Sequence, residues 1–119
     1  MMNLFNVPAI SVQELAQKRA NGDDLIVLDV REPHELAHAN LGDGVILAPL
    51  SELARARLQA LPPQVAADKS AEIAVLCHHG TRSAQVVAWL LQSGWTNIWN
   101  VDGGIEAYAV EVDAAVGRY

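Results

Sequence analysis

The sequence contains a single cysteine, and that scarcity limits what the chain can be. Among its 119 residues Cys77 has no second cysteine to pair with, so no internal disulfide can form and nothing indicates an oxidising compartment. No run of about 18 apolar residues occurs, and the first ten residues lack both the basic start and the apolar run of a secretion signal. We therefore expect a cytoplasmic protein with no membrane partner, in which Cys77 matters only through its own reactivity or packing.

Basic residues are also few. Eight Lys and Arg stand against fourteen Asp and Glu, which gives a formal net charge of −6. Neutralising phosphates requires clustered basic side chains, so this balance argues against a general nucleic-acid binder. With 51% hydrophobic and 18% charged residues the chain has the composition of a globular enzyme, and its length suffices for one core without a metal or disulfide. We expect one domain over residues 1–119.

Strand and helix patterns alternate along the chain. Apolar runs rich in branched residues predict buried strands at residues 25–30, 45–47, 73–77 and 97–101. Helical patterns lie at residues 11–20, where Ser11 and Glu14 form a capping-box motif, and at 51–61, 83–93 and 105–110. Residues 62–70, with two prolines and a small polar run, are interpreted as a loose linker. This order predicts an α/β fold with a parallel sheet wrapped by helices.

Polar residues gather where two of these strands end, at residues 29–35 and 77–83. In open parallel sheets, chemistry is concentrated at the carboxyl ends of the strands. In the second cluster, CHHGTRS, four residues separate Cys77 from Arg82, and Gly80 supplies the freedom for a tight curl that turns backbone amides inward as an anion nest. The helix N-terminus and Arg82 would favour the thiolate of Cys77 over the thiol, and the same groups would stabilise a persulfide.

Simpler interpretations of these residues exist. A lone cysteine that ends a strand is commonly just a small core residue, but the polar neighbours of Cys77 would make a poor piece of core. A metal site is not expected, because a third or fourth ligand is missing near His78 and His79, while His34 and His38 lie in a separate segment.

Three motifs in this order, LDVREPHEL, CHHGTRS and NVDGGIEAY, resemble the rhodanese homology domain over residues 8–119. The resemblance implies a central parallel five-stranded sheet flanked by helices on both faces. It also implies a ping-pong sulfurtransferase without a cofactor, of the thiosulfate:cyanide type, in which sulfur passes through a cysteine persulfide. The donor in such enzymes is often thiosulfate or another sulfane-sulfur compound, and the acceptor is cyanide or a thiol.

Residue by residue, the resemblance makes Cys77 the sulfur carrier. The substrate-binding loop would consist of His78, His79, Gly80, Thr81, Arg82 and Ser83. Asp29 and Arg31 would support that loop, and Glu35 would lie at the mouth of the pocket.

Two roles stay open at the level of single residues. Asp29 is either a general base or, as we favour, a structural carboxylate that caps amides or pairs with Arg31 or Arg82. His78 and His79 are either proton-transfer groups or, as we favour, exposed loop residues that contribute amides and positive potential.

Alternative functions follow from the same motifs. The chain is either an enzyme acting on small acceptors or a persulfide carrier that hands sulfur to a protein partner in thiolation or cofactor assembly. A non-catalytic interaction module ranks last, because such modules commonly lose the nucleophile. A phosphatase also ranks low, since those enzymes place one residue more between Cys and Arg, which widens the cradle for a tetrahedral phosphate.

Overall fold

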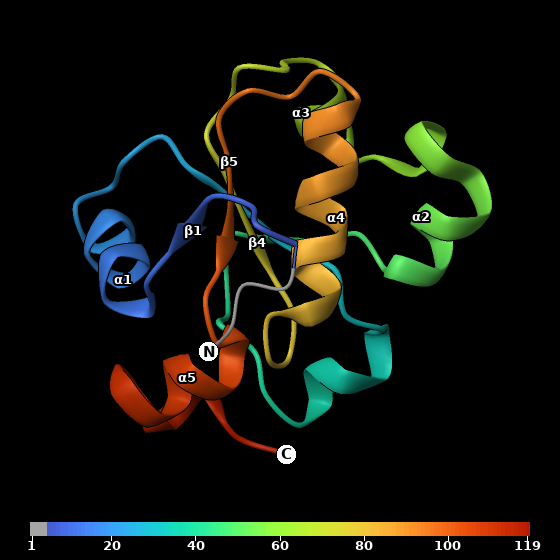
Figure 1. Ribbon diagram of the computed structural model, residues 1–119. Helices are drawn as coiled ribbons and strands as arrows, with labels where there is room; N and C mark the ends of the chain where they lie inside the picture. The colour runs from blue at the N-terminus through green and yellow to red at the C-terminus, as the bar shows by residue number, and fades with distance from the viewer. Residues whose placement is uncertain (1–4) are drawn as a thin grey trace.

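A five-stranded sheet forms the centre of the computed structural model, which describes residues 5–119 (Figure 1). Residues 1–4, which the single-domain prediction includes, lie outside the described residues. The strands are β1 (Ala9–Ile10), β2 (Ile26–Asp29), β3 (Val45–Leu47), β4 (Ile73–Leu76) and β5 (Ile98–Val101). They pair in the order β1-β5-β4-β2-β3 and every pairing is parallel, which confirms the predicted parallel five-stranded sheet.

Helices cover both faces of this sheet. They are α1 (Val12–Ala20), α2 (Leu50–Ala56), α3 (Pro63–Ala66), α4 (Thr81–Gln92) and α5 (Gly104–Glu111), with 3₁₀ turns at Pro33–Ala37, Arg57–Ala60 and Ala114–Val116. One buried cluster joins the sheet to α1 and α5, and a second joins it to α2, α3 and α4. In Figure 1 these two groups of helices accordingly stand on opposite sides of the strands. The predicted two-sided α/β architecture is confirmed.

The central strand β4 explains why its sequence shows no polar alternation. Ile73 and Val75 belong to the cluster on the α4 face, whereas Ala74 and Leu76 belong to the cluster on the α1 and α5 face. All four side chains are fully buried. A parallel strand covered on both sides must be apolar at successive positions, which is what the uninterrupted IAVL run provides.

The predicted linker at residues 62–70 is wrong, because part of it folds and packs. Pro63 begins α3, where a proline costs nothing since the first amide of a helix has no intrahelical acceptor. Val65 is fully buried, and its carbonyl accepts a 3.0 Å hydrogen bond from the indole Nε1 of Trp95. The helix predicted at 51–61 is also interrupted at Arg57, whose φ of 58° does not continue α2.

The sheet order brings the two polar clusters together. Strands β2 and β4 are direct neighbours, so residues 29–35 and 77–83 leave the sheet side by side at its carboxyl edge. Among residues 5–119, no helix is long and apolar enough to cross a membrane.

Candidate functional site

The loop that follows β4 curls around the sulfur of Cys77. Gly80 takes a φ of 103°, a left-handed conformation in which a side chain would be strained, and α4 begins at the next residue. The amide of Gly80 donates to Cys77 Sγ at 3.1 Å, and the amide of Ser83 donates to it at 3.3 Å. The hydroxyl oxygen of Ser83 lies 3.2 Å from the same sulfur. Three polar groups of this loop and of the first turn of α4 therefore converge on the sulfur of Cys77.

Asn100, which sequence reasoning missed, holds this loop from β5. Its Oδ1 accepts the hydroxyl hydrogen of Ser83 at 2.5 Å, and its Nδ2 donates to the carbonyl of Gly80 at 3.1 Å. Asn100 is buried, and Ser83 is fully so. A polar side chain inside a predicted buried strand is the signal that could have found it, because such groups need partners that the strand itself does not provide.

The N-terminus of α5 holds the beginning of the loop. The amides of Ile105 and Glu106 donate to the carbonyls of Cys77 and His78 at 2.9 and 3.1 Å. These amides belong to the NVDGGIEAY motif, so that motif contacts the cysteine loop directly. Gly104 lies at the closest approach, with a φ of 64°.

Arg82 directs its guanidinium at Glu35 rather than at the sulfur. Two hydrogen bonds of 2.7 and 2.9 Å join Arg82 to the two carboxylate oxygens of Glu35, a bidentate arrangement. Hydrogen bonding from Arg82 lowers the pKa of Glu35 well below its usual range, and the same pair raises the pKa of Arg82. In the described part of the chain, Arg82 makes no hydrogen bond to Cys77, so its charge reaches the sulfur only through space.

Asp29 and Arg31 form a second, more deeply buried ion pair. Arg31 is fully buried, and its guanidinium donates to both carboxylate oxygens of Asp29, the shortest contact being 2.7 Å. Asp29 also accepts the backbone amide of Arg31 at 3.0 Å. The geometry therefore pairs Asp29 with Arg31 and not with Arg82, and it brings neither residue to the sulfur.

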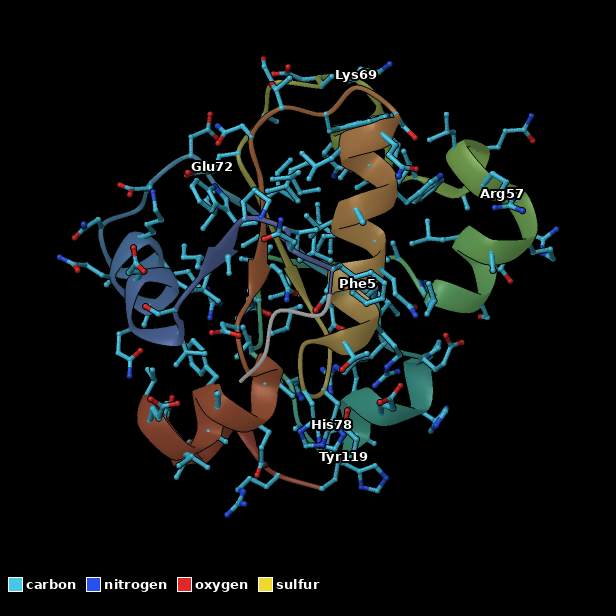
Figure 2. The ribbon with its side chains drawn as sticks, in the orientation of Figure 1. Phe5, Arg57, Lys69, Glu72, His78 and Tyr119 are labelled. Atoms are coloured by element: carbon cyan, nitrogen blue, oxygen red, sulfur yellow. The ribbon has the colours of Figure 1, made fainter. Side chains whose placement is uncertain are left out.

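Tyr119 connects the two ion pairs and was not predicted. Its hydroxyl accepts a 3.0 Å hydrogen bond from Arg31 and donates one of 2.8 Å to Glu35. Its ring stacks on the imidazole of His78 with centroids 3.8 Å apart and planes 6° from parallel. Figure 2 shows His78 and Tyr119 lying together below the end of the loop. Tyr119 lies outside the three motifs, eleven residues beyond the end of NVDGGIEAY, so none of them indicated it.

The two histidines of the loop differ in environment. His79 is exposed, as the structural interpretation expects, but that interpretation is wrong for His78. His78 is half-buried between the rings of His79 and Tyr119, and its Nε2 is buried without a hydrogen-bond partner. Burial, together with the nearby His79, lowers the pKa of His78, which favours the neutral imidazole.

Thr81, the remaining residue of the predicted loop, is exposed at the first turn of α4. His34, which was not predicted as a site residue, is exposed on the 3₁₀ turn that carries Glu35. Within residues 5–119, no three His, Cys, Asp or Glu side chains are grouped so that they could hold a metal ion.

Comparison with known proteins places this site in a family context. The family model described as "Rhodanese-like domain" matches residues 11–111. A protein named sulfurtransferase from Allochromatium vinosum is 32% identical over 87% of this chain and 89% of its own length. The chloroplastic rhodanese-like/PpiC domain-containing protein 12 of Arabidopsis thaliana is 34% identical over 95% of this chain, which spans 38% of that protein.

A solved structure shares the fold at useful sequence identity. The crystal structure of a rhodanese-related protein from Thermoplasma volcanium superposes with a TM-score of 0.71 at 35% identity. The match covers 88% of this chain and 93% of that one. The family-model match over residues 11–111 includes β2 to β5, the loop after β4 and the start of α5.

Proposed function

The chain belongs to the rhodanese-like domain family, and on that premise we propose that it is a sulfurtransferase in which Cys77 carries the transferred sulfur as a persulfide. The observation that carries the proposal is the set of donors around Cys77 Sγ, namely the amides of Gly80 and Ser83. These donors are fixed before any substrate binds, so they stabilise negative charge on sulfur without reorganising.

The first half-reaction takes sulfur from a sulfane-sulfur donor such as thiosulfate. The thiolate of Cys77 attacks the outer sulfur of thiosulfate, a new sulfur–sulfur bond forms, and the old one breaks with sulfite leaving with its electron pair. The proton of the thiol goes to solvent. The product, Cys77–S–S⁻, carries its charge on the terminal sulfur, where inward-pointing amides favour it.

The second half-reaction returns the enzyme to its starting state. Cyanide attacks the terminal sulfur through carbon and leaves as thiocyanate, while Cys77 recovers the thiolate. A thiolate acceptor reacts in the same way and leaves as a persulfide. Atoms and charge balance in both cases, and neither half-reaction needs a metal or an organic cofactor.

Intact-protein mass spectrometry tests this function. After incubation with thiosulfate and removal of the excess, we expect a mass gain of one sulfur atom, which cyanide then removes as thiocyanate. Cys77→Ala should show neither the gain nor the thiocyanate. Ser11→Ala, a substitution at the cap of α1 far from the loop, should behave like the wild type.

Two results would contradict the proposal. One is an unchanged mass after treatment with thiosulfate and with other sulfane-sulfur donors. The other is release of phosphate from an aryl phosphate that depends on Cys77, which would support the lower-ranked phosphatase instead.

A further inference from the structure

Tyr119 joins the two ends of the loop that surrounds Cys77. At one end, Arg82 pairs with Glu35, whose Oε1 accepts the hydroxyl of Tyr119 at 2.8 Å. At the other end, the ring of Tyr119 stacks on His78, the residue that directly follows Cys77. Contacts from Arg82 through Glu35 and Tyr119 to His78 thus close a ring of side chains around the loop.

Cys77 is buried beneath the loop that this ring of side chains surrounds. Cys77 is 1% exposed, although the mechanism requires a donor and then an acceptor to approach Sγ along the axis of the bond that breaks. In this ring of side chains, His78 belongs to the loop, Arg82 to the start of α4, and Glu35 forms the partly buried ion pair with Arg82. Tyr119 comes from the segment that follows α5, and of the four side chains in the ring it is the one farthest along the chain from a strand of the sheet.

The attachment of Tyr119 is partly open to water. The residue is 40% exposed, so its two part-buried hydrogen bonds compete with water. The neighbouring Arg118 forms an ion pair with Glu106 at 2.6 Å that is largely exposed, and such pairs contribute little to holding a segment in place. Displacing the Tyr119 side chain would uncover His78 and free Glu35 Oε1 without breaking any backbone hydrogen bond of the sheet.

We propose that Tyr119 is a specificity-determining residue that filters by size the molecules reaching Cys77. The inference rests on the proposed sulfurtransferase function, and it selects the acceptor class: a small nucleophile, such as cyanide or a low-molecular-weight thiol, passes the ring, whereas a thiol carried on a folded protein does not. The chain then acts as an enzyme for small acceptors rather than as a carrier for a protein partner.

Labelling of the thiol tests the filter without any sulfur transfer. Cys77 is the only cysteine, so every maleimide that adds to a thiol reports on this site. N-ethylmaleimide and a maleimide on a polyethylene-glycol chain react by the same step, in which the thiolate adds to the double bond and the adjacent carbon takes a proton. The ratio of the two second-order rate constants therefore measures steric access alone.

We expect Tyr119→Ala to raise the rate with the polyethylene-glycol maleimide by about tenfold, the factor that loss of roughly one net hydrogen bond gives. The rate constant with N-ethylmaleimide should rise less. The ratio of the N-ethylmaleimide rate constant to the polyethylene-glycol maleimide rate constant should therefore fall toward one. Tyr119→Phe keeps the stacked ring but loses both phenol hydrogen bonds, and it should lie between. Val110→Ala, exposed on α5, should match the wild type.

An unchanged ratio in both Tyr119 variants would overturn the filter. If Tyr119→Ala lowers the thermal midpoint enough to blur the comparison, Tyr119→Phe decides it alone. A second arm compares release of sulfur from the persulfide to cyanide and to reduced thioredoxin; fast release to thioredoxin by the wild type would also overturn the proposal. Absence of any persulfide would instead contradict the proposed function and leave the labelling result standing.

Discussion

Ser83 has one hydroxyl hydrogen and two neighbours that could use it. The amide of Asn100 is oriented by its bond from Nδ2 to the carbonyl of Gly80, which turns Oδ1 toward Ser83. Since Oδ1 can only accept, the hydroxyl hydrogen goes to Asn100, and Ser83 Oγ offers a lone pair to Cys77. The hydroxyl therefore accepts from the thiol, and the backbone amides are the donors that remain for a charged sulfur.

The coupling between Ser83 and Asn100 is measurable as a double-mutant cycle. Ser83→Ala and Asn100→Ala should each lower the free energy of unfolding by about 1–3 kcal/mol, because each leaves the buried partner unsatisfied. The double variant should lose clearly less free energy of unfolding than the two single variants lose together, because neither partner of the Ser83–Asn100 bond is then left unsatisfied. Urea unfolding followed by circular dichroism gives the three values. Additivity within about 0.5 kcal/mol would mean that the bond contributes nothing specific.

Sequence reasoning found Cys77 and its loop because polar residues interrupted apolar elements in a recognisable order. It did not find Asn100, because the rest of β5 has the apolar pattern of an ordinary buried strand. The two hydrogen-bond partners of Asn100 lie 17 and 20 residues away in the sequence. A single sequence gives the side-chain type at a position but not which loop lies above it.

Among the elements, α5 is the one whose first residue decides the path of the cysteine loop. The backbone of Gly104 has a φ of 64°, and a Cβ there would come within 2.6 Å of the carbonyl oxygen of Cys77 and closer still to that of His78. The glycine pair before Ile105 makes the tight turn from β5 into α5, with φ values of 78° and 64°. The structure adds the close approach of two backbones, which glycine alone allows.

Gly104→Ala should therefore displace the loop rather than only strain the turn. We expect loss of stability of about 1–3 kcal/mol, as for a non-glycine residue forced into this conformation. The same variant should lose most sulfur transfer from thiosulfate to cyanide. Gly22→Ala is the matched control, because its φ of 71° imposes similar strain while nothing lies within 4 Å of the added Cβ. Equal losses of activity in both variants would show that strain, not contact with the loop, is responsible.

Elements with enough residues were predictable and short ones were not. Strands β2 and β4 and helix α4 show their burial in continuous or periodic apolar positions. Strand β1 has two residues, a single period of alternation, so no repeated pattern could reveal it. Helix α3 has four, and the two prolines at its start were taken as a sign of a linker although Pro63 begins the helix.

Across the whole molecule, two ion pairs and the phenol of Tyr119 meet at one end of the sheet. Arg31 and Tyr119 are 88 residues apart and Glu35 and Tyr119 are 84 apart, yet each pair shares a hydrogen bond. These contacts depend on the path of the tail after α5, which no local pattern specifies. Folding is needed to bring them together, so their charges must contribute to the pH dependence of stability.

Glu35 determines the sign of that dependence. Arg82 lowers the pKa of Glu35 in the folded chain below the ordinary value of 4.5, so the unfolded chain binds a proton more readily than the folded one. The stabilisation from Glu35 is therefore fully present above about pH 4.5 and is lost as the pH falls toward the lowered pKa of the folded state. Thermal unfolding midpoints measured between neutral and acidic pH should decrease through this window.

Glu35→Gln isolates this contribution from that of the other carboxyl groups. At neutral pH the variant should melt lower than the wild type, because Arg82 loses its charged partner and Tyr119 a charged acceptor. Below pH 4.5 the two melting curves should converge, since protonation of the wild-type carboxyl removes the same charge. Glu52→Gln removes an exposed carboxylate that pairs with Arg55 on α2, and it should run parallel to the wild type at every pH. If Glu35→Gln also ran parallel to the wild type, the ion pair between Glu35 and Arg82 would not be linked to folding.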